Sequence, residues 1–188
     1  MDSDLRRILV VCTANICRSP MFEGLLRRDL GARGSLIEVE SAGLLDRDEP
    51  ADPEAVSTMA ERGVDISGHR SRAVARLDLD GFDLILTMGR EHLREIVIDQ
   101  PELFPVTFTV KSFARALSAP RDRADRSGAR DRIRSMSQGR SPSTMLGESP
   151  EDDVDDPYRL GRAAFEATAT ELSELSLRIS SGLRAIGA

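Results

Sequence analysis

Two residues near the beginning of the chain have types and a spacing that suit phosphoryl transfer. Five residues separate Cys12 from Arg18. A cysteine thiolate is a strong nucleophile, and a guanidinium presents a planar fork of N–H donors that matches two oxygens of a phosphate group. The pair predicts a site in which the thiolate attacks phosphorus while the arginine binds the phosphate oxygens.

The elements around this pair place its two members at the ends of one tight loop. An apolar run over residues 8–11 predicts a buried strand before Cys12, and Pro20 suits the first turn of a helix that follows Arg18. Backbone N–H groups of such a loop converge on an anion and favour the thiolate. From the residues alone, the alternative is a buried cysteine at a strand end and a surface arginine at a helix start. We expect a phosphate-binding loop made of Thr13, Ala14, Asn15, Ile16, Cys17, Arg18 and Ser19.

A second motif, Asp156-Pro157-Tyr158, lies near the end of the chain. The proline restricts Asp156 to an extended backbone and so limits where its carboxylate points. Together with the loop around Cys12, this motif resembles the low-molecular-weight protein tyrosine phosphatases, a family of cysteine-dependent phosphomonoesterases. The resemblance implies that Cys12 is the nucleophile, that Asp156 is the general acid and that Tyr158 lines the substrate cleft. Arg159 stands where many relatives have a second tyrosine, which resembles the bacterial subgroup that acts with polysaccharide-export tyrosine kinases.

The resemblance also implies a reaction and residues that support it. Phosphotyrosine in a protein would be hydrolysed through a phosphocysteine intermediate, with inorganic phosphate as product and a bacterial tyrosine kinase as a candidate partner. Ser41 and His69 would hold Asn15, and Ser19 would donate a hydrogen bond to the sulfur. Two aliphatic residues would wall the substrate cleft where many relatives carry an aromatic one, namely Leu44 and Leu45.

Two residues of the loop leave alternatives open. In several relatives a cysteine at the position of Cys17 pairs reversibly with the catalytic one, so the resemblance implies a protective Cys12–Cys17 disulfide; a small packing residue is the other interpretation. Ala14 replaces the glycine usual in relatives, and if its methyl group disables the loop the chain is a non-catalytic phosphate-binding module. A third alternative is an arsenate reductase coupled to a small thiol, because no cysteine follows Cys17 to support the thioredoxin-coupled form.

Composition narrows the class of protein further. The chain has 188 residues and a net charge of -6, which suits one domain and gives no reason to expect nucleic-acid binding. Its two cysteines both lie in the loop, its first residues are acidic, and no apolar run is long enough to span a bilayer. We expect a cytoplasmic protein that uses no membrane and no metal or other cofactor.

The pattern of the whole chain predicts an α/β fold. Strands are expected at residues 8–11, 36–40, 82–88 and 104–110, alternating with helices, and a long amphipathic helix at 165–186. This alternation predicts a three-layer domain with a four-stranded parallel sheet and helices on both faces, and the resemblance implies the strand order 2-1-3-4. We interpret residues 1–188 as a single phosphatase domain. Residues 118–150, rich in Arg, Ser, Asp and Gly, are expected to form a flexible insertion that buries little.

Overall fold

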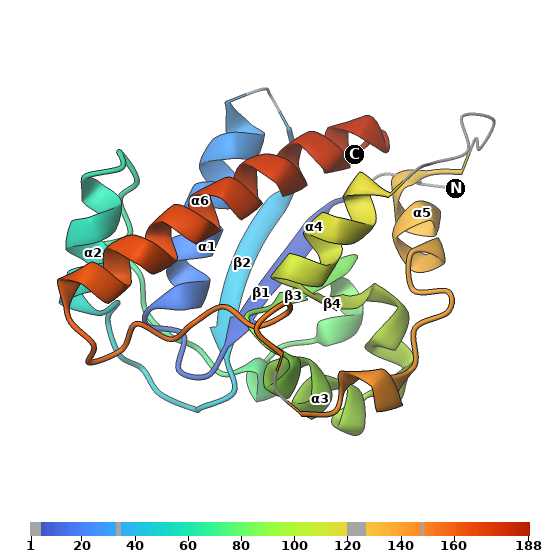
Figure 1. Cartoon of the computed structure of the whole chain (residues 1–188), viewed down its shortest axis with the longest axis horizontal. Coiled ribbons are helices and arrows are strands. Elements are labelled where there is room, and N and C mark those ends of the chain that lie inside the picture. Colours follow the sequence, from blue (N-terminus) through green and yellow to red (C-terminus); the bar gives the residue numbers. More distant parts are fainter. Residues whose placement is uncertain (1–4, 33–34, 120–126, 148) are drawn as a thin grey trace.

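The fold is a parallel sheet between two layers of helices. A computed structural model of the chain describes residues 5–32, 35–119, 127–147 and 149–188. The strands are β1 (Arg7–Cys12), β2 (Glu38–Gly43), β3 (Leu84–Thr87) and β4 (Thr107–Thr109). All pairs are parallel and the order is β2-β1-β3-β4, which confirms the predicted architecture and order (Figure 1).

Helices cover the two faces of this sheet unequally. They are α1 (Arg18–Gly31), α2 (Pro53–Ala60), α3 (Arg90–Asp99), α4 (Val110–Ser118), α5 (Ala129–Ser135) and α6 (Arg162–Ala185). Short 3-10 turns occupy Val74–Arg76, Leu79–Gly81, Pro101–Val106 and Pro142–Met145. Helices α1, α4 and α6 lie over one face, and α3 and the first three turns lie toward the other (Figure 1).

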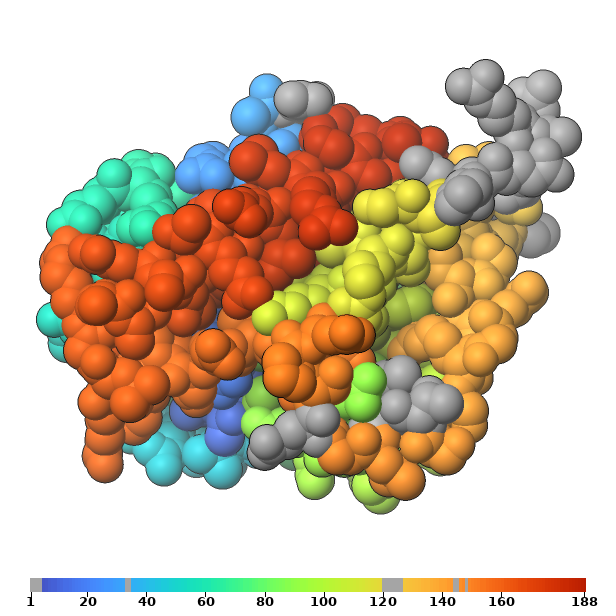
Figure 2. All heavy atoms as spheres, viewed as in Figure 1, coloured from blue at the N-terminus to red at the C-terminus, as the bar shows by residue number. Residues whose placement is uncertain are grey.

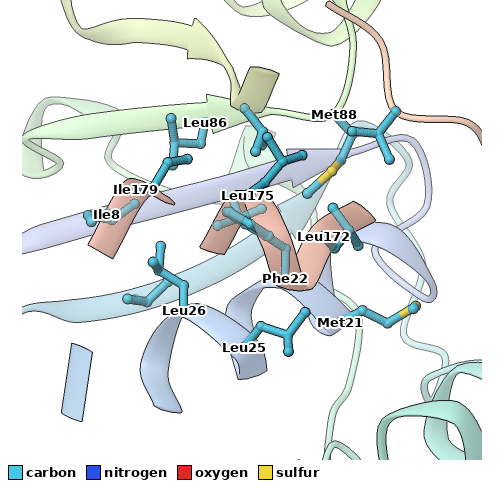
Figure 3. Packing of buried hydrophobic residues seen from close by; sticks show 14 of the residues in the cluster. Ile8, Met21, Phe22, Leu25, Leu26, Leu86, Met88, Leu172, Leu175 and Ile179 are labelled. Atoms are coloured by element: carbon cyan, nitrogen blue, oxygen red, sulfur yellow. The ribbon is translucent and has the colours of Figure 1, made fainter. Parts of the chain in front are cut away.

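Alternation along β1 divides the core between these faces, because successive side chains of a strand point to opposite sides. Ile8 and Val10 belong to the larger apolar cluster, whereas Leu9 and Val11 belong to the smaller one. In the larger cluster, side chains of β1, β3, α1 and α6 converge (Figure 3). Burial on both faces explains the uninterrupted apolar sequence of this central strand.

Two strands differ from their predicted bounds. Strand β2 begins later than expected and includes Ser41, Ala42 and Gly43, while Leu36 is exposed. Pro101–Val106, whose second half was predicted as strand, forms a 3-10 turn, and β4 keeps only three residues. Pro105 lacks the N–H group that a strand in a sheet would donate, which explains why the strand starts after it.

The segment after α4 packs more tightly than its composition predicts. Ala129 and Ile133 of α5 are buried in the larger cluster. The Arg140 guanidinium lies 4.0 Å from the centre of the Phe108 ring and 4.7 Å from that of Phe104. These contacts anchor the described part of the segment beside β4. Residues 120–126 and 148, included in the expected flexible insertion, lie outside the described residues.

No helix in the described part of the chain is long and apolar enough to cross a membrane.

Candidate active site

The loop between β1 and α1 lies at the carboxyl edge of the sheet, the usual place for ligands in such folds. Cys12 ends β1 and Arg18 begins α1, as the spacing predicts. The loop forms the floor of a pocket of about 180 Å³. Figure 2 shows blue atoms, which belong to the first part of the chain, at the surface between the cyan atoms and the orange atoms. The pocket is lined by Cys12, Thr13, Ala14, Ile16, Cys17, Arg18, Leu45, Arg47, Asp156 and Tyr158.

Two donors surround the sulfur of Cys12. Ser19 Oγ lies 2.9 Å from Cys12 Sγ, and the Asn15 backbone N–H donates to Sγ at 3.3 Å. The Asn15 side-chain amide donates to Ser19 Oγ at 2.9 Å, and the Ser19 hydroxyl can donate to the sulfur when the sulfur is anionic. A thiolate sulfur only accepts, so it can accept both of these hydrogen bonds.

Asn15 holds the shape of the loop. Its backbone φ of 57° is left-handed, a conformation that asparagine tolerates better than most residues, and its side chain is fully buried. The side-chain amide donates to Ser41 Oγ at 2.8 Å and accepts from the Arg72 N–H at 3.1 Å. His69 Nε2 lies 2.8 Å from the Asn15 carbonyl oxygen, and since a carbonyl only accepts, Nε2 carries the hydrogen. Asn15 and Ser19 thus face the interior and do not line the pocket.

Gly43, two residues after Ser41 at the end of β2, also shapes the loop. It pairs with Cys12 across the sheet. A Cβ atom added at Gly43 would lie 2.9 Å from the Thr13 carbonyl oxygen and from the Ala14 carbonyl carbon, too close for any residue but glycine. Ala14 itself is free of backbone strain, since among the described residues other than glycine only Asn15 and Arg159 have a positive φ.

The pocket brings together Arg18 and Asp156, which are far apart in the chain. Arg18 is almost completely buried, and its Nη2 donates to Asp156 Oδ2 at 2.6 Å. Nη2 also donates to Thr13 Oγ1 at 3.3 Å, and Nη1 donates to the Val154 carbonyl at 3.2 Å. The Asp156 side chain is about half exposed, so it lies at the mouth of the pocket.

An aspartate that the sequence did not single out anchors the segment before Asp156. Asp152 is 2% exposed and pairs with Arg115 and with Arg90 Nε, the latter at 2.6 Å. Burial alone would raise the pKa of Asp152, but hydrogen bonds from Arg115 and Arg90 outweigh it and lower the pKa below its ordinary value. The next residue, Asp153, accepts from the Arg90 backbone N–H at 2.7 Å. The carboxylates therefore tie the Asp156 segment to α3 and α4.

The walls of the pocket differ in part from the predicted cleft. Leu45 and Tyr158 line it, but the prediction for Leu44 is wrong because Leu44 packs against the smaller core cluster. Its N–H donates to the Cys12 carbonyl, and of the two leucines Leu45 lines the pocket. Arg47, missed by the sequence analysis, adds a positive charge to the wall.

Cys17 lies in the same pocket as Cys12, and both thiols are free. Burial raises the pKa of the Cys17 thiol, and the negative charges of Asp52 and Asp156 add to this effect. Cys17 is therefore a neutral thiol near pH 7.

This fold, with a cysteine and an arginine at the two ends of the loop between β1 and α1, is typical of the class of cysteine-dependent phosphatases. The family described as "Low molecular weight phosphotyrosine protein phosphatase" matches residues 7–119. The chain belongs to this family and is a protein-tyrosine phosphatase.

Similar proteins agree with this assignment. The "Probable low molecular weight protein-tyrosine-phosphatase EpsP" of Ralstonia solanacearum is 36% identical over 163 residues, covering 86% of this chain and 85% of that protein. The "Low molecular weight protein-tyrosine-phosphatase Wzb" of Escherichia coli strain K12 is 42% identical over 97 residues, covering 51% of this chain and 63% of that protein. The crystal structure of a low molecular weight protein tyrosine phosphatase from T. tengcongensis superposes with a TM-score of 0.68 at 32% identity, covering 93% and 97%.

Proposed function

We propose that the pocket hydrolyses phosphotyrosine in proteins, with Cys12 as nucleophile, Arg18 as phosphate ligand and Asp156 as general acid and base. The observation that carries this proposal is the convergence of these three side chains on one pocket, with Arg18 and Asp156 joined at 2.6 Å. Thiol, guanidinium and carboxylate are the groups that a double displacement at phosphorus requires.

In the first step the Cys12 thiolate attacks phosphorus, and the phenolic oxygen of the tyrosine leaves. The loop N–H groups of residues 13–19 and the Arg18 guanidinium stabilise the charge on the equatorial phosphoryl oxygens. Asp156 at the mouth of the pocket protonates the leaving oxygen. Ser19 stabilises the thiolate through the contact with Sγ at 2.9 Å, and it makes the sulfur a better leaving group in the next step.

In the second step water attacks the phosphocysteine, with Asp156 now acting as base, and inorganic phosphate is released. Asn15 keeps the loop N–H groups aimed at the phosphate, and Ser41 and His69 hold Asn15 through the contacts at 2.8 Å. These three residues support the reaction without touching the substrate.

The walls of the pocket fit the aryl ring of a phosphotyrosine. Leu45 offers an aliphatic surface and Tyr158 an aromatic one. We propose a phosphotyrosine protein as substrate, a bacterial tyrosine kinase of exopolysaccharide synthesis as partner, and a cytoplasmic location. We also propose that residues 1–188 work as one phosphatase domain in which residues 118–150 include a flexible insertion.

Hydrolysis of p-nitrophenyl phosphate by the native protein and by Cys12→Ser and Asp156→Ala variants tests the proposal. Turnover that disappears with Cys12→Ser and falls strongly with Asp156→Ala supports it. Phosphate binding without turnover by the native protein would instead identify a binding module, and thiol-dependent release of arsenite from arsenate would identify a reductase.

A further inference from the structure

A buried histidine lies directly behind the phosphate loop, and the mechanism above does not use it. His92 is the third residue of α3, which follows the carboxyl end of β3. Its side chain has no exposed surface, and Nε2 lies 2.9 Å from Thr13 Oγ1. A polar ring placed in the interior at this point requires a partner, and the loop hydroxyl supplies it.

The same hydroxyl contacts the guanidinium of the loop. Arg18 Nη2 donates to Thr13 Oγ1 at 3.3 Å, so one oxygen joins His92 and Arg18. An arginine is only a donor, and Thr13 Oγ1 therefore accepts from it. The contact with His92 Nε2 exists in either neutral tautomer, because the hydroxyl can donate to a bare Nε2 or accept from an Nε2–H while it accepts from Arg18.

Burial, together with the nearby Arg18, keeps the ring neutral. Burial, followed by the positive charge of Arg18, lowers the pKa of His92 to about 4, against smaller opposing effects of the Gly89 backbone and Asp153. The other charge facing the ring is Glu91, whose Oε1 lies 3.3 Å from Nε2 but whose side chain is mostly exposed. Near pH 7 the imidazole is thus neutral and places no second positive charge beside Arg18.

We propose that His92 is a positioning residue for the phosphatase reaction: through Thr13 it fixes the Arg18 guanidinium in the orientation that binds the phosphoryl oxygens. The inference rests on the proposed role of Arg18. Without the His92 contact, the Thr13 hydroxyl rotates more freely and holds Arg18 less firmly, while the contacts of Arg18 with Asp156 and Val154 remain. Arg18 then turns less completely toward the equatorial oxygens as they gain charge.

A double-mutant cycle with His92→Leu and Thr13→Val tests whether His92 acts on Arg18 through Thr13. Each single change should lower kcat for p-nitrophenyl phosphate about tenfold with a smaller change in KM, as expected for one hydrogen bond to a charged group that matters most in the transition state. The double variant should be no slower than the slower single one, since both changes break the same connection. His92→Gln, which keeps a polar atom near the position of Nε2, should regain most of the lost kcat.

Ile96→Val is the matched control for the packing of α3, since Ile96 is buried in the same helix and lies in the smaller core cluster. It should lower the unfolding temperature and leave kcat unchanged. Three results would overturn the role of His92. The losses of kcat in the two single variants could multiply in the double variant, or His92→Leu could keep the native kcat. The third result is a folded His92→Gln variant that does not regain the lost kcat. These results are distinguishable from failure of the proposed function. In that case the native protein itself would show no turnover that depends on Cys12.

Discussion

Arg18 Nη2 and Asp156 Oδ2 lie 2.6 Å apart at the mouth of the pocket, although the two residues are 138 positions apart in the chain. A phosphate dianion in the loop and the Asp156 carboxylate therefore compete for the same guanidinium. Replacing Asp156 with alanine should remove the competitor and tighten the binding of inorganic phosphate about threefold or more, the scale of a half-exposed ion pair.

The measurement is the inhibition constant of phosphate against p-nitrophenyl phosphate at near-neutral pH. The same variant should lose about 100-fold or more in kcat, because it lacks the general acid. Phosphate that binds more weakly to Asp156→Ala than to the native protein would contradict the competition between the two anions.

Gly43 is predicted to be indispensable for the loop. Alanine at this position would place a Cβ 2.9 Å from the Thr13 carbonyl oxygen and press the loop out of shape. Gly43→Ala should lower kcat/KM about tenfold or more, because small displacements of positioned catalytic groups are costly. Gly31→Ala serves as control, since nothing lies within 4 Å of its added Cβ. Equal activity of the two variants would show that the loop does not depend on this approach.

Asp152 should contribute to stability in a manner that depends on pH. Its pKa is lower in the folded protein than in the unfolded chain, so its contribution is complete above the ordinary aspartate pKa of about 3.9 and is lost as the pH falls through the folded pKa. Asp152→Asn should reduce the free energy of unfolding by about 1–3 kcal/mol at pH 7 and by less at pH 3.

Urea unfolding at the two pH values measures this difference. Asp155→Asn is the matched control, because Asp155 belongs to the same segment and is exposed. A loss of stability in Asp152→Asn that is as large at pH 3 as at pH 7 would show that packing, and not charge, explains it.

Cys17 is predicted to protect Cys12 from irreversible oxidation. Peroxide converts a thiolate to a sulfenic acid, which condenses with a nearby thiol to form a disulfide and water. Both sulfurs lie in one pocket, and Cys17 is a buried neutral thiol that reacts slowly with peroxide itself. Native protein inactivated by peroxide should recover with dithiothreitol, whereas Cys17→Ala should recover far less. Equal recovery of the two proteins would leave Cys17 as a packing residue.

Local sequence patterns were sufficient to predict most of the elements that position the catalytic residues. The spacing from Cys12 to Arg18 spans one loop, so the strand before it and the helix after it were sufficient to place both residues. The residues that were missed act over long distances in the chain: His92 contacts Thr13 across 79 positions, and Asp152 contacts Arg90 across 62. Neither belongs to a motif, and only the folded sheet brings them together.

Strand ends were predicted less well for a physical reason. The apolar alternation of residues 36–40 gave no sign that pairing continues through Ser41 and Gly43, which remain in β2 because they adjoin the end of β1. The alternation of residues 104–110 hid the effect of Pro105. The burial of Ile133 in α5 was also missed, because one apolar residue among arginines has no periodicity to reveal a core face.

Trapping the covalent intermediate tests the central claim most directly. Asp156→Ala, which lacks the base for the second step, is mixed with p-nitrophenyl phosphate, quenched in acid within the first turnovers and digested for mass spectrometry. The account predicts one added phosphoryl group on the peptide that contains Cys12, located on its sulfur and absent from Cys12→Ser treated in the same way. A phosphoryl group on another residue, or steady turnover in the Cys12→Ser variant, would contradict the account.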